Sequence, residues 1–146
     1  MTEQLLTGGI HHLRLTVTDL QASRFFYTTL LGFTVVVESP AEYDPEAAAM
    51  YAILFGGIVM ARGNLLMGLR PVAPTHDVFS EDRVGLDHLS FDVPSHDDLE
   101  RAVALFNEHA VPHGPITALP AFGIYVLPFR DPDNIALELT APIPVS

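Results

Sequence analysis

An internal repeat is the feature that most constrains the fold of this chain. Residues 12–17 read HLRLTV and residues 88–93 read HLSFDV, 76 positions further along. In both stretches apolar residues alternate with polar ones, as in a strand with one buried face. Each is followed by the signals of a helix and then by three more strand-like stretches. The chain is therefore predicted to consist of two copies of one module.

The first module, at about residues 9–71, continues from its opening strand into a helix. Asp19 is a typical N-cap, residues 20–31 carry apolar side chains at helical spacing, and Gly32 predicts the helix end. Three strands are then predicted at 33–38, within 50–60 and at 64–70, joined in part by a hairpin turn at 61–63. Residues 39–49, with two prolines, are predicted to be a loop that could form a flap over a site.

The second module, at about residues 84–141, repeats this order. Ser95 and Asp98 resemble a capping box, and the helix should run to about residue 110, before a Val-Pro pair. Three short strands are predicted at 113–119, 122–129 and 134–140. The polar stretch 72–83 has no regular period and is predicted to link the modules.

Length and composition limit the possible functions. With 146 residues, 49% of them hydrophobic, we expect one domain spanning 1–146. A net charge of −11 argues against binding to nucleic acids or anionic membranes. The absence of cysteine excludes disulfides and thiolate chemistry. No stretch reads as a leader or a membrane span, so a cytoplasmic protein is expected.

The repeat and its flanking motifs resemble the vicinal oxygen chelate superfamily, which includes glyoxalase I, extradiol dioxygenases, fosfomycin-resistance enzymes and bleomycin-binding proteins. The motifs that carry the resemblance are HLRLTVTDL at 12–20, FY at 26–27, LGF at 31–33 and RDPDNIALEL at 130–139. It implies an α+β fold in which two βαβββ modules form a curved mixed sheet around a cup. The floor of that cup would carry one divalent metal ion.

The resemblance maps the metal-ligand positions onto His12, Gly68, His88 and Glu138. Glycine offers no ligand atom, so three metal ligands are implied: His12, His88 and Glu138. The alternation agrees, because both histidines and Glu138 face away from their apolar neighbours. Two imidazoles and one carboxylate leave open coordination positions and suit Fe, Mn, Zn or Ni, among which the sequence does not choose.

Each proposed ligand also has a plainer interpretation. The two histidines could be strand residues satisfied by backbone or water, and Glu138 could form a salt bridge with Arg14 or Arg70. The remaining five histidines are predicted to be surface residues: His11, His76, His96, His109 and His113.

Two arginines should share the face of the first sheet that carries His12. Arg14 lies two residues after His12, and Arg70 two residues after Gly68. A guanidinium there could clamp a carboxylate or phosphate of a substrate. The alternative for Arg14 is an internal pair with Asp92. Residues 131–134, Asp-Pro-Asp-Asn, are predicted to be a turn.

This chain lacks residues that known enzymes of the superfamily use for their specific reactions. Glyoxalase I and the methylmalonyl-CoA epimerases use a fourth carboxylate at the place of Gly68. Extradiol dioxygenases share the His, His, Glu set but carry a tyrosine where this chain has Pro128, and only the nearby Tyr125 could replace it. Fosfomycin-resistance enzymes have a threonine in place of Arg14. The catalytic candidates that remain are Glu138, Arg14 and Tyr125.

Two functions therefore compete. The first is a metal-dependent enzyme whose small substrate chelates the ion, a Lewis acid, through neighbouring oxygens. The second is a bleomycin-resistance-like protein that binds a small apolar or aromatic ligand without chemistry, using aromatic residues at 51, 55, 122 and 125. The complete ligand set favours the enzyme. A homodimer is expected, because relatives pair modules within or between chains and the apolar runs 51–60 and 122–129 need cover.

Overall fold

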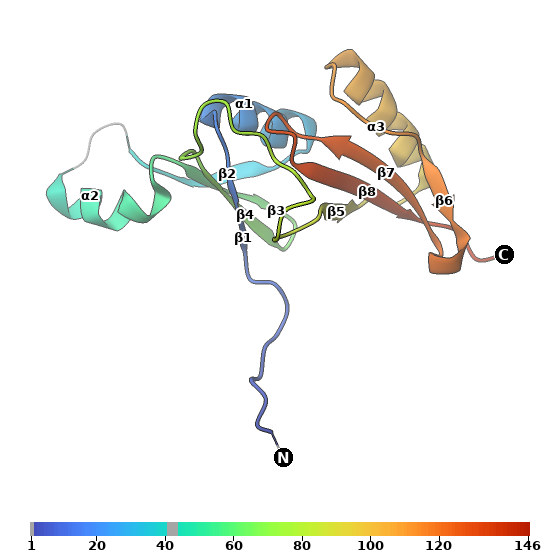
Figure 1. Cartoon of the computed structure of the whole chain (residues 1–146), viewed down its shortest axis with the longest axis horizontal. Coiled ribbons are helices and arrows are strands. Elements are labelled where there is room, and N and C mark those ends of the chain that lie inside the picture. Colours follow the sequence, from blue (N-terminus) through green and yellow to red (C-terminus); the bar gives the residue numbers. More distant parts are fainter. Residues whose placement is uncertain (1, 41–43) are drawn as a thin grey trace. The chain divides into compact units, whose positions relative to one another are not determined.

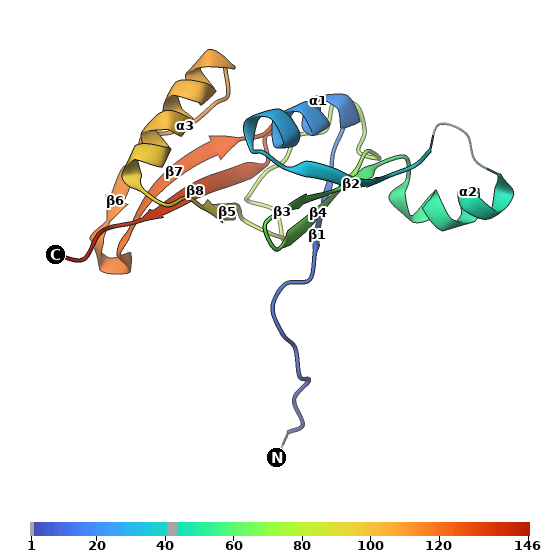
Figure 2. The same ribbon diagram turned by 180° about the vertical axis from the view of Figure 1, so that it is seen from behind.

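Each half of the repeat forms its own four-stranded mixed sheet. The computed structural model describes residues 2–40 and 44–146, which divide into two units, residues 1–75 and 76–146. In unit 1 the strand order is β1 (Leu13–Thr16), β4 (Leu65–Arg70), β3 (Ile58–Arg62) and β2 (Thr34–Glu38). In unit 2 it is β5 (Leu89–Asp92), β8 (Ala136–Pro142), β7 (Ile124–Arg130) and β6 (Thr117–Leu119) (Figures 1 and 2).

The two sheets have the same topology. The first strand of each pairs in parallel with the last, and the other pairs are antiparallel. This order confirms the predicted α+β class and the repeat. The boundary between the units falls between residues 75 and 76, inside the stretch 72–83 that was predicted to link the modules.

Unit 1 places its first helical segment against the apolar face of its sheet. Helix α1 (Leu20–Phe25) begins at Asp19, whose side chain accepts hydrogen bonds from the backbone N–H groups of Gln21 and Ala22, as predicted. It continues as a π-helical segment, η1 (Phe26–Leu30), that ends just before Gly32, which has a φ of 75°. Side chains of this helical segment and of the strands form the buried core of the unit: Leu15, Val17, Phe26, Tyr27, Met60, Met67 and Leu69.

The stretch before β3 differs from the prediction. Residues 45–54 form helix α2 (Pro45–Tyr51) and a 3-10 segment, η2 (Ala52–Leu54), instead of loop and strand. The local reason is that Asp44 caps the helix through the Ala47 N–H and Pro45 occupies the first helical position. Hydrophobicity alone suggested a strand from residue 50. The predicted flap also covers residues 41–43, which lie outside the described residues. Figure 1 shows α2 beyond the end of the sheet of its own unit.

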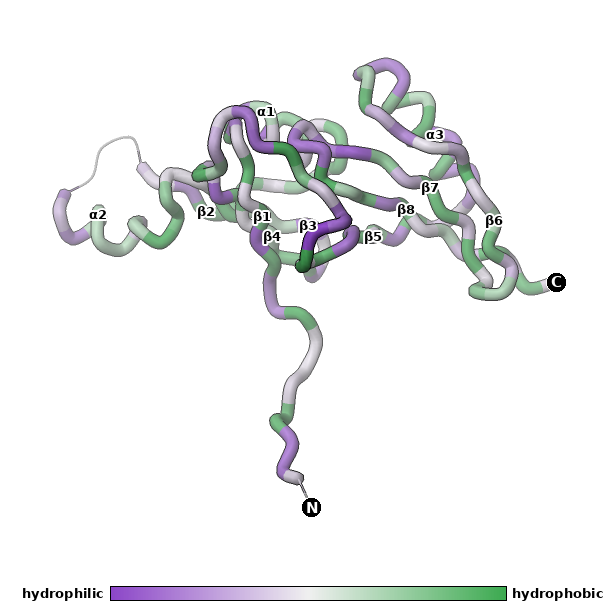
Figure 3. The backbone as a smooth tube through the Cα atoms, in the orientation of Figure 1, coloured by the Kyte–Doolittle hydropathy of each residue, from purple (hydrophilic) through white to green (hydrophobic). Residues whose placement is uncertain are grey.

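Unit 2 is built around one amphipathic helix, α3 (His96–Glu108). Its N-cap is Ser95, whose side chain accepts from the Asp98 N–H and donates to the Asp98 carboxylate, as the capping box predicted. Hydrophilic and hydrophobic residues alternate along α3 in Figure 3. The ring of Phe106 stacks on Phe129 of β7 at 4.6 Å between centroids, which holds the helix on the sheet.

The residues that precede β5 are held against the β7–β8 turn. Arg130 forms an ion pair with Glu81, and the Phe79 N–H donates to the Asp133 carbonyl. The predicted turn at 131–134 is present, with Asn134 in the left-handed region at φ 65°. The final strands begin at residues 117, 124 and 136. The second of them starts later than predicted because a 3-10 segment, η3 (Pro120–Phe122), occupies the beginning of the predicted strand. In the described part of the chain no helix has the length and apolarity that a membrane span requires.

Candidate functional site

Unit 2 brings together two of the three predicted metal ligands. His88 lies immediately before β5 and Glu138 in the middle of β8, and Ser90 pairs with Glu138 in the parallel register. The Nε2 atom of His88 is 4.0 Å from Oε1 of Glu138. The side chain of Glu138 is only 21% exposed, while that of His88 is 45% exposed, so the pair sits at an accessible edge of the face.

Asp87 orients the imidazole of His88. Its Oδ1 is 2.6 Å from Nδ1 of His88. For the carboxylate to accept this hydrogen bond, the ring must carry its proton on Nδ1. Neutral His88 then keeps a lone pair on Nε2, the atom that faces Glu138. A carboxylate behind a histidine is the usual arrangement that fixes the tautomer of a metal-binding imidazole.

The geometry of the pair fits a shared metal ion. The 4.0 Å separation is too long for a hydrogen bond. Two ligand atoms that are each about 2.0–2.2 Å from one ion can lie up to ~4.4 Å apart. Thr140 donates to Oε1 of Glu138 over 3.3 Å and is also hydrogen-bonded to Ser90. These contacts hold the carboxylate on the polar face of the sheet.

Tyr125 lies on the opposite face of that sheet. It pairs with Ala141 on β8, whereas Glu138 pairs with Pro128, and position 128 is three residues after position 125 along β7, an odd offset. Successive strand side chains point to opposite faces. The ring of Tyr125 contacts His96 of α3 at 4.7 Å between centroids. The structure therefore does not bring Tyr125 to Glu138, and its predicted catalytic role there is not supported.

Unit 1 holds the third predicted ligand beside a pocket. His12 is exposed just before β1, and its Nδ1 is 2.8 Å from Nδ1 of His11. The two rings meet edge to face at 5.1 Å. Both histidines line a pocket of about 250 Å³ whose other lining residues are Leu13, Arg14, Ile53, Leu54, Val59, Leu66 and Gly68.

Arg14 and Arg70 extend over the same face of unit 1, as predicted. Arg14 pairs with Gly68 and Thr16 pairs with Arg70 in the parallel register, so the two arginines lie on adjacent strands. The guanidinium of Arg14 donates to the Ile53 carbonyl. Both guanidinium groups contact the ring of Phe55, with Cζ to centroid distances of 5.7 Å for Arg14 and 4.2 Å for Arg70.

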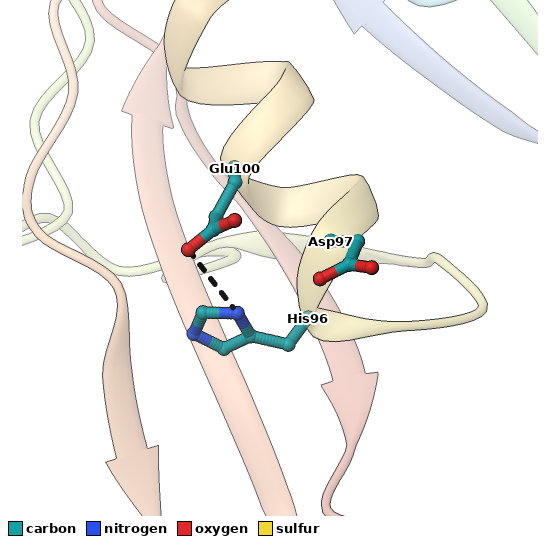
Figure 4. A group of neighbouring side chains, drawn as sticks. All are labelled: His96, Asp97 and Glu100. Atoms are coloured by element: carbon teal, nitrogen blue, oxygen red, sulfur yellow. Dashed lines mark ion pairs between the residues drawn. The ribbon is translucent and has the colours of Figure 1, made fainter.

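The first turn of α3 contains another group of possible metal ligands. One ligand atom from each of His96, Asp97 and Glu100 lies within 4.8 Å of the others. Figure 4 shows His96 paired with Glu100, at 3.6 Å, while Asp97 points elsewhere along the helix turn. The carboxylates are exposed, and an ion pair four residues apart on a helix accounts for the grouping.

The remaining predicted site features have plainer roles. His113 hydrogen-bonds to Asn107 and to the Gly114 carbonyl, so it is a structural residue rather than a free surface one. His76 is exposed, as predicted. Phe122 is 76% exposed in its 3-10 segment.

Two residues of the candidate site were missed at the level of sequence, His11 and Asp87. Each could have been found from its position, because His11 directly precedes the predicted ligand His12 and Asp87 directly precedes the predicted ligand His88. Such a neighbour supports the ligand only where the two side chains lie within hydrogen-bonding distance, and they do so at both positions.

Comparisons with known proteins agree with this topology. Residues 9–139 match the Glyoxalase/Bleomycin resistance protein/Dioxygenase superfamily. The uncharacterized protein YwkD of Bacillus subtilis (strain 168) is 31% identical over 92% of this chain and 98% of its own length. A glyoxylase/bleomycin resistance protein/dioxygenase domain from Frankia sp. EAN1pec is 29% identical, with a TM-score of 0.72 over 93% of both chains. The fosfomycin resistance protein FosX of Listeria monocytogenes has the same fold at 15% identity, with a TM-score of 0.69 over 93% of this chain and 94% of its own.

Proposed function

The chain belongs to the Glyoxalase/Bleomycin resistance protein/Dioxygenase superfamily, and on that premise we propose that it is a metal-dependent enzyme. Its substrate would be a small molecule that chelates the ion through neighbouring oxygens. The observation that carries this proposal is the trio Asp87, His88 and Glu138. An oriented imidazole nitrogen faces a carboxylate oxygen at 4.0 Å, a spacing that suits two ligands of one ion.

The proposed ligand set is His12 from unit 1 with His88 and Glu138 from unit 2. One divalent ion, Fe, Mn, Zn or Ni, would supply Lewis acidity toward a bound substrate oxygen. Asp87 would hold His88 in its ligand tautomer, and Thr140 would hold one oxygen of Glu138. The other oxygen of Glu138 would then be available to take or return a substrate proton. Arg14 would contact the substrate from the pocket beside His12.

The proposed assembly follows the same reasoning. The two modules, at 9–71 and 84–141, would together form one domain. We further propose a cytoplasmic homodimer.

Residues of the site limit which reaction is proposed. Gly68 offers no fourth carboxylate, which disfavours the lactoylglutathione lyase reaction of glyoxalase I. Pro128 lies opposite Glu138 on β7, at the place where a ring-cleaving dioxygenase would carry its tyrosine. The reaction class proposed is therefore proton transfer or addition at a metal-bound oxygen compound.

A second candidate function is supported by the pocket of unit 1. Its lining is mainly aliphatic, from Leu13, Ile53, Leu54, Val59 and Leu66, and would suit an apolar or aromatic ligand that is bound without chemistry. A sequestering protein has no need of the ligand set in unit 2. Metal content therefore separates the two functions.

The test is metal binding by the purified protein and three variants. Elemental analysis of the protein as isolated, followed by calorimetric titration with Zn²⁺ and Mn²⁺, should give one ion per chain. His88→Ala and Glu138→Gln should each weaken binding severely, whereas His76→Ala, which removes an exposed histidine, should leave it unchanged. Equal affinity in His88→Ala and the parent protein would refute the site.

A further inference from the structure

Two arginines of unit 1 lack the carboxylate partner that most others in the chain have. The chain has seven arginines and no lysine. Arg24, Arg101 and Arg130 each form an ion pair with a carboxylate. Among the described residues, neither Arg14 nor Arg70 forms one. Acidic residues outnumber basic ones 18 to 7, so this local cationic site is unusual for the chain.

The two guanidinium groups converge on one aromatic ring. Their Cζ atoms lie 5.7 and 4.2 Å from the centroid of Phe55, so they are within about 10 Å of each other. Two like charges near each other repel, and an anion bound between or beside them would offset this repulsion. The contact with Phe55 contributes about 0.5–2 kcal/mol for a cation over an aromatic face, but it leaves the net charge of the two groups unneutralised.

The ring of Phe55 is held in place by an unfavourable backbone conformation. Phe55 ends the 3-10 segment η2 with a φ of 51°, in the left-handed region that bulky residues rarely adopt. It nevertheless remains 52% exposed, so burial of the ring does not account for this conformation. Backbone strain of this kind is often found where a side chain must be presented to a ligand.

Two contacts restrain Arg14. Its aliphatic stem lies over Gly68, and its guanidinium donates to the Ile53 carbonyl. A guanidinium has five N–H donors, and within residues 2–40 and 44–146 the hydrogen bond to Ile53 uses one of those of Arg14. The same side chain lines the aliphatic pocket next to His12. The site therefore combines an apolar cavity with two cations on adjacent strands.

We propose that Arg14, Arg70 and Phe55 form a subsite for the anionic group of a small apolar acid. The carboxylate or phosphonate would accept hydrogen bonds from the two guanidinium groups, and the apolar body would occupy the adjacent pocket. This inference rests on the proposed function in that it names the substrate class of the same enzyme. The anion binding itself, however, involves residues of unit 1 alone.

The experiment is calorimetric titration of the full-length protein with three probes: benzoate, phenylphosphonate and the neutral benzamide. Benzoate or phenylphosphonate should bind about tenfold more tightly than benzamide, because hydrogen bonds to a charged partner contribute more than neutral ones. Whichever anion binds more tightly identifies the preferred head group. Equal affinity for benzamide and both anions, or no binding of either anion, would overturn the proposal.

Matched variants locate the binding. Arg70→Gln should lose about tenfold in affinity for the anion and little for benzamide. Arg83→Gln, which changes the net charge equally at an exposed arginine of unit 2, should bind as the parent does. Arg70→Lys should recover part of the loss, since it restores the charge without the planar fork. Unchanged affinity in Arg70→Gln, or an equal loss in Arg83→Gln, would contradict the subsite.

These experiments distinguish a failure of the proposed metal site from a failure of the anion subsite. His88→Ala should lose the metal and still bind benzoate, because His88 belongs to the other unit. If both parent and His88→Ala bind benzoate but neither binds metal, the anion subsite stands and the enzyme proposal falls. Circular dichroism of each variant checks that a loss of binding is not a loss of fold.

Discussion

The aliphatic stem of Arg14 lies directly over Gly68. A Cβ atom at Gly68 would be 3.0 Å from Cγ and 3.5 Å from Cδ of Arg14, and Gly68 is buried beneath this side chain. The position that the superfamily resemblance assigns to a fourth metal ligand is thus covered by part of a cationic side chain. Because the obstructing atoms belong to a flexible side chain, a larger residue could displace them.

Gly68→Glu tests what position 68 faces. We expect the new carboxylate to displace the stem of Arg14, to tighten binding of Zn²⁺ and Mn²⁺, and to weaken binding of benzoate. Calorimetric titration measures all three affinities. Gly68→Gln, of nearly the same size but neutral, is the control and should weaken benzoate binding without the same gain for metal. Unchanged metal affinity in Gly68→Glu would mean that position 68 does not face the ion.

The glyoxalase I reaction should be negligible. The resemblance implies that glyoxalase I moves a proton between neighbouring carbons with a second carboxylate at the metal, and this chain has Gly68 at that position. The measurement is formation of S-lactoylglutathione from the hemithioacetal of methylglyoxal and glutathione, with Zn²⁺, Mn²⁺ or Ni²⁺ added. Brisk turnover with any of these ions would show that Gly68 does not prevent this chemistry.

Asp87 should matter for metal affinity although it is no ligand. Its contact with Nδ1 of His88 selects the tautomer that presents Nε2, and loss of such a partner typically costs about 10- to 100-fold in metal affinity. We expect a loss of this order for Asp87→Asn by competition with a chelating dye. Asp97→Asn, in the exposed first turn of α3, should leave the affinity unchanged. A loss in Asp97→Asn with none in Asp87→Asn would assign the ion to the helix instead.

The Glu81–Arg130 pair should contribute to stability in a defined range of pH. Hydrogen bonding to Arg130 is the main cause that lowers the pKa of Glu81 from 4.5 to about 2. A group whose pKa is lower in the folded state stabilises the protein at any pH above its pKa in the unfolded state. This contribution is lost as the pH falls from about 4.5 toward 2. Glu81→Gln should therefore melt below the parent at pH 6, and the difference in Tm should shrink steadily below pH 4.5. A difference that is independent of pH would mean that the charge of Glu81 does not stabilise the fold.

A homodimer should be present at micromolar concentration. Exposed apolar side chains occur in both stretches predicted to need cover, including Ile53 at 68% and Phe122 at 76% exposure. Sedimentation velocity should show a dimer. Phe122→Ser should weaken it by about tenfold or more, since burial of a phenylalanine contributes roughly 1.5–3 kcal/mol. A monomer alone at this concentration would contradict the expectation.

Much of the fold follows from local patterns along the chain. The alternation around His12 and His88 predicted strands with one polar and one apolar face, and Asp19 and Ser95 marked the helix starts correctly. These signals succeed because side-chain period and capping depend on neighbouring residues only. The prediction for residues 45–54 was wrong because the periodic signal there was ambiguous. The apolar composition of this segment fits either a strand or a helix, and the decision lay with the cap at Asp44.

The sequence by itself determined the repeat, the two polar strand faces and the residue types able to bind a metal. Tertiary structure alone decided which side chains support them. It placed Asp87 behind His88, turned Tyr125 toward α3 and away from Glu138, and brought the guanidinium groups of Arg14 and Arg70 to the ring of Phe55. The physical reason is that these contacts depend on ring orientation, strand register and one strained turn, which bring together atoms from different elements. Periodicity specifies the face of a strand but not the partners that a side chain meets there.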